Sequence, residues 1–108
     1  HVSFEMRGID EYMRATGRVK RGGHPILWGP GRHGPGDNTF SYFLDPLGNV
    51  MEYTTELEKI PDDSTWEPRV FEMTHENSDQ WGTANTNEVF IPAQKNDPDQ
   101  GLWTPSPV

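Results

Sequence analysis

The sequence predicts an α+β fold: a single module with the order strand, helix, strand, strand, strand (βαβββ), followed by an extended C-terminal tail. Three features carry this prediction. They are an alternating segment at residues 1–6, a helical pattern after it, and two strand-like segments on either side of a turn at 45–49. The chain has 108 residues, of which 31% are hydrophobic, so its length and composition fit one small domain.

The first strand is predicted at residues 1–6, where apolar and polar residues alternate strictly. One face carries Val2, Phe4 and Met6, and the other carries His1, Ser3 and Glu5. Because successive side chains of a strand point to opposite faces, this pattern is typical of a strand. Gly8 then interrupts the pattern.

An amphipathic helix is predicted to follow this strand. Asp10 is a suitable N-cap residue, and the helix should end near the glycine pair at 22–23. Its apolar residues are Ile9, Met13 and Val19 on one face, with Tyr12 and Ala15 beside it.

The segment 22–36 is predicted to be a loop, since it holds six glycines and three prolines around a short apolar piece at 26–28. Residues 39–45 form a second clear strand, and residues 50–55 form the strand that returns. Between these two strands lies the sequence Asp45-Pro46-Leu47-Gly48-Asn49. Proline at the second position and glycine at the fourth predict a turn.

The second part of the chain differs in composition from the first, so residues 1–60 are predicted to be the βαβββ module and residues 61–108 an extended tail. Residues 1–60 carry 7 Lys and Arg against 8 Asp and Glu, whereas residues 61–108 carry 2 against 9 and hold 6 of the 10 prolines. Large aromatic residues are too frequent in the tail for a disordered acidic segment. We expect them to anchor it: Trp66, Phe71, Trp81, Phe90 and Trp103.

Composition also excludes several classes of function. A formal net charge of −8 argues against nucleic acid as a partner, because phosphate neutralisation needs clustered Lys and Arg. No apolar run approaches the roughly 20 residues of a membrane span. The chain has no cysteine, so disulfides and thiolate metal sites are excluded, and a reducing, cytoplasmic location is expected.

Two residues on the predicted strands are candidates for a metal site. His1 opens the first strand on its polar face, and Glu52 lies in the middle of the returning strand. A carboxylate there is costly to bury unless a cation or hydrogen-bond donors meet it. Two histidines and one carboxylate on one face suit a divalent first-row metal such as non-haem Fe(II). The alternative is that Glu52 points to solvent, as most carboxylates do.

The predicted loop contains a second candidate, within Gly29-Pro30-Gly31-Arg32-His33-Gly34-Pro35-Gly36. Glycine lets a backbone pass close to a ligand, and proline restricts the loop. His33 in this loop, together with Tyr42 on the next strand, could transfer protons near neutral pH. The alternative is an ordinary surface loop with an exposed histidine.

The segment GPGRHGPGDNTFSYFLDPLGNVMEY resembles the C-terminal catalytic region of extradiol ring-cleavage dioxygenases, in the vicinal oxygen chelate superfamily. The resemblance spans residues 1–60 and continues weakly to Asp79-Gln80-Trp81-Gly82. It implies a fold of paired βαβββ modules, of which this chain would be one fragment. The expected partners are a catecholic substrate, O2, the companion module (in the same protein or another chain) and further copies in a homo-oligomer.

The resemblance also assigns roles to individual residues. His1 and Glu52 resemble two metal ligands, and the third ligand would lie in the preceding module, outside this chain. Fe(II) is the implied cofactor, and Mn(II) fits the same ligand set. His33 resembles the acid/base histidine, and Tyr42 resembles the tyrosine that hydrogen-bonds bound substrate.

One departure from the family pattern concerns the substrate. Where members that recognise a carboxylated catechol have arginines, this chain has Trp28 and, approximately, Asn77-Ser78. We therefore expect Trp28 to contact a neutral or aromatic ring substituent; the alternative is that it fills the core. His24 and His75 match no ligand position and are expected at the surface.

Two other functions compete with the dioxygenase. One is a non-catalytic module of the same superfamily that binds a small aromatic ligand. The other is a different metalloenzyme of the superfamily, such as a glyoxalase-type isomerase or a thiol transferase. His33 and Tyr42 separate them, because neither alternative has a chemical reason to keep both residues.

Overall fold

The structure, a computed structural model, describes residues 1–85. Five elements form the module: β1 (Val2–Glu5), α1 (Ile9–Arg21), β2 (Trp28–Arg32), β3 (Thr39–Leu44) and β4 (Val50–Thr55). A short helix, α2 (His75–Ser78), follows. The predicted α+β fold with the order βαβββ is therefore confirmed.

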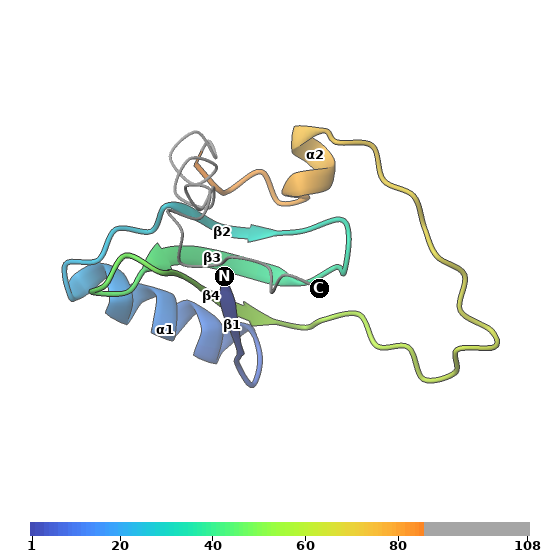
Figure 1. The fold of residues 1–108 in the computed structure, drawn as a ribbon, viewed down its shortest axis with the longest axis horizontal. Helices are drawn as coiled ribbons and strands as arrows, with labels where there is room; N and C mark the ends of the chain where they lie inside the picture. Colours follow the sequence, from blue (N-terminus) through green and yellow to red (C-terminus); the bar gives the residue numbers. More distant parts are fainter. Residues whose placement is uncertain (86–108) are drawn as a thin grey trace, which may run out of the picture.

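The four strands form one sheet in the order β1-β4-β3-β2, and α1 covers one face of it (Figure 1). β1 lies parallel to β4, while the other neighbouring strands are antiparallel. The register aligns Ser3 with Glu52, Glu52 with Tyr42, and Tyr42 with Trp28. Because paired residues share a face, these four side chains form one row across the sheet on the side opposite α1.

Helix α1 begins one residue earlier than its expected cap. Gly8, with φ of 134°, occupies the N-cap position and makes no side-chain capping bond. Asp10 lies inside the first turn, where it accepts a hydrogen bond from Arg14 Nε at 2.7 Å. The prediction of Asp10 as N-cap is therefore wrong, although its carboxylate still lies where the helix dipole favours negative charge.

The face that α1 buries also differs from the predicted one. Tyr12, Ala15 and Thr16 are buried, whereas Met13 is 43% exposed. The Tyr12 hydroxyl donates to the Phe40 carbonyl and lies 2.7 Å from Ser41 Oγ. Burial raises the pKa of Tyr12 to about 12. Polar contacts with β3, which hydrophobic periodicity does not record, thus set the orientation of the helix.

Strand β2 runs through the segment that was predicted to be a loop. It pairs with β3, but the register shifts between Trp28 and Gly31, so the strand contains an irregularity around Pro30. An edge strand tolerates glycine and proline because one row of its backbone groups needs no partner. The loop prediction for residues 22–36 is therefore wrong over 28–32.

The turn between β3 and β4 has the predicted geometry. The Asp45 carboxylate accepts hydrogen bonds from the backbone N–H groups of Leu47 and Asn49, each at 2.8 Å. Gly48 has φ of 88°, a conformation that glycine adopts without strain.

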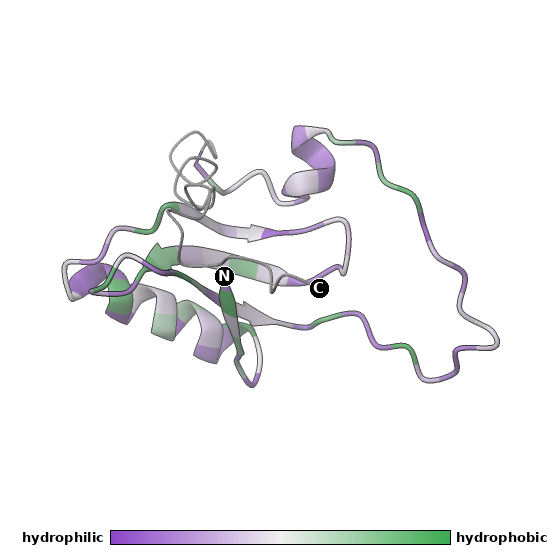
Figure 2. Ribbon diagram, viewed as in Figure 1, coloured by the Kyte–Doolittle hydropathy of each residue, from purple (hydrophilic) through white to green (hydrophobic). Residues whose placement is uncertain are grey.

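Hydrophobic stretches lie in β1 and β3 on either side of β4, as Figure 2 shows.

After β4 the chain leaves the sheet and then returns to it (Figure 1). Residues 56–70 are exposed, whereas residues 77–85 return along β2. Trp66 is 37% exposed and Trp81 is 41% exposed, and the Arg32 guanidinium lies 5.9 Å from the centroid of the Trp81 ring. Polar bonds to β2 also hold the returning segment. Phe90 and Trp103, the remaining predicted anchors beyond Phe71, lie outside the described residues.

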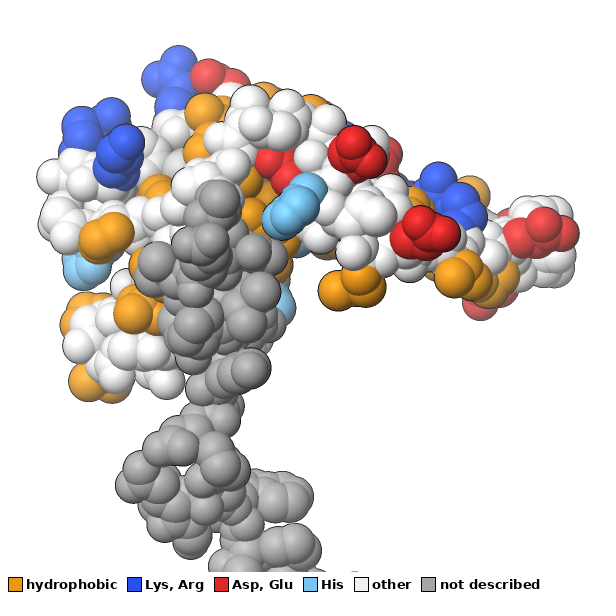
Figure 3. Space-filling view, turned by 90° about the horizontal axis from the view of Figure 1, so that it is seen from above, with side chains coloured by type: hydrophobic (Ala, Val, Ile, Leu, Met, Phe, Trp, Pro, Cys, Tyr) orange, Lys and Arg blue, Asp and Glu red, His pale blue; other side chains and the backbone are white. Residues whose placement is uncertain are grey.

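Positively charged residues gather at the end of α1. The last turn of α1 carries Arg18, Lys20 and Arg21. On the face that Figure 3 shows, most of the Lys and Arg side chains lie at one end of the molecule and most of the Asp and Glu side chains lie toward the other. Within residues 1–85, no helix has the length and apolar character needed to cross a membrane.

Candidate metal centre

His1 and Glu52 meet on the face of the sheet opposite α1. His1 Nε2 lies 3.2 Å from Glu52 Oε2, because β1 runs parallel to β4 and places Ser3 beside Glu52. Glu52 is only 4% exposed, so it does not point to solvent. The Ser3 hydroxyl donates a hydrogen bond to the same carboxylate oxygen. The carboxylate is therefore buried with an imidazole and a hydroxyl as neighbours.

This pair supplies two donor atoms of the type that a divalent metal requires. Among residues 1–85, no three His, Cys, Asp or Glu side chains gather closely enough to hold a metal ion. An imidazole nitrogen and a buried carboxylate nevertheless form a donor set that suits first-row metals such as Fe(II) and Mn(II). A third protein ligand would have to come from outside the described residues.

Tyr42 connects His1 and Glu52 to His33. Its hydroxyl lies 3.2 Å from His33 Nε2, and its ring packs edge-on against the His1 ring with 5.2 Å between centroids. Burial raises the pKa of Tyr42 well above its usual value, and the charge of Glu52 and a hydrogen bond with it act in the same direction. Tyr42 is therefore a protonated phenol throughout the physiological pH range.

His33 is held at both ring nitrogens. Nδ1 lies 2.9 Å from the Ser78 carbonyl oxygen, and Nε2 faces Tyr42. The imidazole stacks on the Phe40 ring with 4.0 Å between centroids. Burial lowers the pKa of His33 below its usual value, so the neutral form is favoured at neutral pH. This half-buried histidine is not the exposed surface histidine of the alternative interpretation.

Trp28 lies in an aromatic cluster beside His33. Its ring is nearly parallel to that of Tyr42, with an interplanar angle of 12°, and its centroid lies 4.3 Å from that of Phe40. Trp28 is 9% exposed and belongs to the buried cluster on this face. It therefore fills part of the core, and it also lines a cavity of about 290 Å³ together with His33.

The glycines on either side of His33 make room for the chain itself. A Cβ atom on Gly31 would lie 2.7 Å from Asp79 Oδ1, and one on Gly34 would lie 2.7 Å from the Asn77 carbonyl oxygen. These glycines were expected to let a ligand approach the backbone. At these two positions, residues 77–79 approach it instead.

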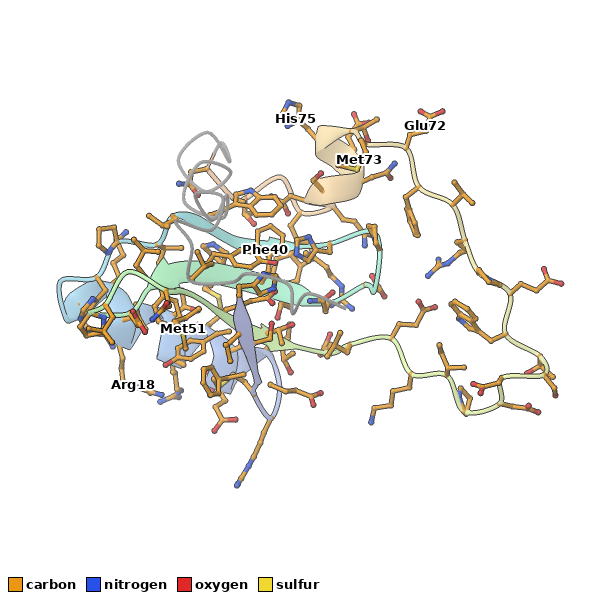
Figure 4. The ribbon with its side chains drawn as sticks, viewed as in Figure 1. Arg18, Phe40, Met51, Glu72, Met73 and His75 are labelled. Carbon is orange, nitrogen blue, oxygen red and sulfur yellow. The ribbon has the colours of Figure 1, made fainter. Side chains whose placement is uncertain are left out.

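Two site neighbours were not predicted from the sequence. Ser3 shares the polar face of β1 with His1, and this alternation was the signal that could have identified it. Asp79, which lies near β2, carries no such signal. The remaining histidines, His24 and His75, are exposed as expected, and Figure 4 shows His75 pointing away from the sheet.

Comparisons with known proteins place the chain in a superfamily. No family model matches it. It is 30% identical over 91 residues to metapyrocatechase 2 of Cupriavidus necator, a match that covers 84% of this chain and 28% of that protein. It also matches the crystal structure of a Mn(II)-bound glyoxalase from Novosphingobium aromaticivorans.

That structural match has a TM-score of 0.73 and 43% sequence identity, and it covers 80% of this chain and 28% of the other. The chain thus spans about a quarter of the length of each of these two proteins. The fold, the sequence match and the structural match agree, and the chain belongs to the vicinal oxygen chelate superfamily.

Proposed function

We propose that this chain is the metal-binding module of an extradiol dioxygenase, which inserts both atoms of O2 into a catecholic ring beside its two hydroxyls. One observation carries the proposal: a line of contacts runs from His1 through Glu52 and Tyr42 to a half-buried, neutral His33. A metal-ligand pair and an acid/base group are thereby held on one face. The similarity to a metapyrocatechase, an extradiol dioxygenase, supports the same reaction.

In this proposal, His1 Nε2 and the Glu52 carboxylate hold the metal, and a companion module supplies the third ligand. Bound Fe(II) would supply the redox chemistry by holding a catecholate and O2 together, and Mn(II) fits the same ligands. The chain contributes the anionic ligand in a buried setting. The Ser3 hydroxyl fixes the orientation of that carboxylate, as groups around metal ligands commonly do.

His33 and Tyr42 act on the substrate in this proposal. The neutral imidazole of His33 accepts a proton from a substrate hydroxyl at Nε2 and later returns it as the ring opens. The protonated phenol of Tyr42 donates a hydrogen bond to a substrate oxygen and so fixes the position of the ring. Packing against Trp28 and Phe40 holds both side chains in place.

Trp28 supports a proposal about the ring substituent. The cavity that it lines with His33 also has Pro35, Phe71 and Met73 in its wall, and its charged lining residue is Glu72. Such a wall favours an uncharged, hydrophobic substituent over a carboxylate. Kinetics with catechol carrying an alkyl or a carboxyl group test this point, and a preference for the carboxylated compound would reject it.

A glyoxalase-type reaction is the second candidate, because the structural neighbour described as a glyoxalase shares 43% sequence identity with this chain. It would use the same metal ligands. It has no need of an acid/base histidine placed beside a tyrosine for ring cleavage.

One experiment separates these functions. The full-length protein is loaded with Fe(II) without oxygen, and catechol and then air are added while oxygen consumption and absorbance are recorded. The proposal predicts one O2 consumed per catechol and a yellow ring-fission product. Binding of catechol without oxygen consumption would support a binding module. Conversion of a hemithioacetal in the absence of ring cleavage would support the glyoxalase-type enzyme.

A further inference from the structure

The hydrogen bond at His33 Nδ1 determines which nitrogen carries the proton. A carbonyl oxygen can only accept, so the contact of 2.9 Å with the Ser78 carbonyl requires a hydrogen on Nδ1. In the neutral ring, Nε2 then carries the lone pair and faces the Tyr42 hydroxyl at 3.2 Å, whose single hydrogen is shared between this nitrogen and the Glu52 carboxylate. Because the partner of one nitrogen fixes the state of the other, the position of the Ser78 carbonyl selects the tautomer.

Backbone hydrogen bonds hold this carbonyl from both sides. Before it, the Asn77 carbonyl accepts from the Gly34 N–H at 2.7 Å; after it, the Gln80 N–H donates to the Arg32 carbonyl at 2.6 Å. These two bonds lie on either side of the contact between His33 and the Ser78 carbonyl. Residues 77–80, here called the clamp segment, therefore lie against the chain on either side of His33.

The carboxylate of Asp79 keeps the clamp segment in its conformation. Its Oδ1 accepts from the Arg32 N–H at 3.0 Å and from the Trp81 N–H at 3.1 Å, and its Oδ2 accepts from the Ala84 N–H at 2.8 Å. One of these bonds joins the segment to the end of β2, and the other two close the turn that follows. Hydrogen bonds to a charged acceptor are roughly twice as strong as neutral ones.

The glycines of the motif around His33 permit this approach. At Gly31 a Cβ would collide with Asp79 Oδ1, and at Gly34 it would collide with the Asn77 carbonyl oxygen. The Gln80 side chain adds a further bond, from Nε2 to the His33 carbonyl at 2.6 Å. Bonds from all four clamp residues thus converge on the three residues centred on His33.

We propose that the clamp segment holds His33 in the tautomer with hydrogen on Nδ1, and that Asp79 is the positioning residue that keeps it there. The consequence is that His33 presents a lone pair, not a hydrogen, toward Tyr42 and the metal-binding pair. His33 then begins the reaction as a proton acceptor at Nε2. This inference rests on the acid/base role of His33 in the proposed function.

Nitrogen NMR of the His33 ring tests the inference directly. The full-length protein, labelled with ¹⁵N in its histidine rings and prepared without a paramagnetic metal, should show a protonated Nδ1 and an unprotonated Nε2. The His33 signals are identified by their loss in His33→Phe. Hydrogen on Nε2 in the wild-type protein would overturn the inference. This measurement is made on the wild-type protein, so it does not depend on whether a variant of the clamp segment folds.

Substitutions then test the role of Asp79. In Asp79→Asn both tautomers should be populated, and kcat should fall by about twofold to tenfold with little change in KM, since a fraction of molecules lacks the acceptor. Gln80→Ala, a milder change in the same segment, should shift the ring nitrogens in the same direction by less. Ser78→Ala is the matched control, because it retains the carbonyl, and it should give the wild-type spectrum.

The outcomes separate this inference from the proposed function. A wild-type spectrum in both Asp79→Asn and Gln80→Ala would overturn the clamp and leave the dioxygenase standing. Unchanged turnover in His33→Phe would overturn the acid/base role of His33. The tautomer that the clamp segment selects would then play no part in catalysis. A mixture of tautomers in Asp79→Asn together with reduced kcat would support both.

Discussion

His1 Nε2 lies 3.2 Å from Glu52 Oε2, although His1 immediately precedes β1 and Glu52 lies in β4, the last strand in chain order. The parallel pairing of β1 with β4 creates this contact, since it aligns Ser3 with Glu52 and so places His1 at the same end. A carboxylate is costly to bury unless a cation or hydrogen-bond donors meet it, and the Ser3 hydroxyl donates to this one. In the proposed function, a cation bound by both His1 and Glu52 would stabilise the buried charge further.

Glu52→Ala is therefore expected to abolish metal binding, because a site left with one ligand from this module is too weak. Metal content of the purified full-length protein, measured by atomic emission, checks this. Glu5→Ala is the matched control: Glu5 lies on the same strand as His1, is exposed, and should leave the metal content unchanged. A stoichiometric metal content in Glu52→Ala would contradict the ligand assignment.

His33→Ala should retain the metal but lower turnover by ~10²-fold or more, the usual scale for loss of an acid/base group. The measurement pairs metal analysis with oxygen consumption on the same sample. His75→Ala, which removes an exposed imidazole, should behave like the wild type. Loss of the metal from His33→Ala would show that its role has been misassigned.

Tyr42→Phe tests the hydroxyl group apart from the ring. Stacking on Trp28 should persist, since the two rings are nearly parallel, whereas the bonds to His33 and Glu52 disappear. We expect kcat to fall by roughly tenfold to a hundredfold, with metal content unchanged. Steady-state oxygen uptake measures the change, and wild-type kinetics would remove Tyr42 from the mechanism.

Stability should depend on the ion pair between Arg32 and Asp37 in acid. The Arg32 guanidinium, 3.1 Å away, holds the pKa of Asp37 below its usual value, so the folded state binds this proton less readily than the unfolded state. The pair's contribution is therefore complete above the ordinary aspartate range and is lost as pH falls through the lower folded pKa.

Urea denaturation of wild type and Asp37→Asn at several pH values measures this effect. Asparagine also tolerates the positive φ of 49° at this position, so backbone strain is matched. The difference in midpoint should be small at pH 7, because Asp37 is partly exposed, and should vanish in acid. A difference that grew as the pH fell would have the wrong sign. Asp63→Asn, in the exposed segment after β4, is the control.

Tyr12→Phe should destabilise the fold by about 1–3 kcal/mol, the range for leaving buried partners unsatisfied. Its hydroxyl bonds to the Phe40 carbonyl and to Ser41 Oγ, and these contacts orient α1 on the sheet. Equilibrium unfolding checks the value. Tyr53→Phe offers a comparison at a tyrosine that lies only partly buried on β4, and a similar loss there would show that the effect is not specific to the α1 contact.

Local patterns predicted the parts of the fold that depend on local chemistry. The alternation at residues 1–6 and the turn at Asp45 need only neighbouring residues, and both were predicted. Strand β2 was missed because its glycines and proline are loop residues in any local analysis. Its pairing with β3 and its place at the sheet edge are properties of the whole sheet.

The same distinction applies to the candidate site, where local patterns identify some residues and the contacts of others depend on the whole fold. His1 and Glu52 could be chosen from strand faces and a resemblance, but the burial of Glu52 depends on the neighbouring strands β1 and β3. The contact between His33 and the Ser78 carbonyl joins residues 45 positions apart and involves no side chain of Ser78. No sequence pattern records such a contact.

Diffraction from crystals of the full-length protein grown with Mn(II) tests the central claim most directly, because anomalous scattering locates the ion without assumption. The account predicts one manganese coordinated by His1 Nε2 and the Glu52 carboxylate, with Tyr42 and His33 beside it. Manganese at another place, with His1 and Glu52 contacting no metal ion, would contradict it.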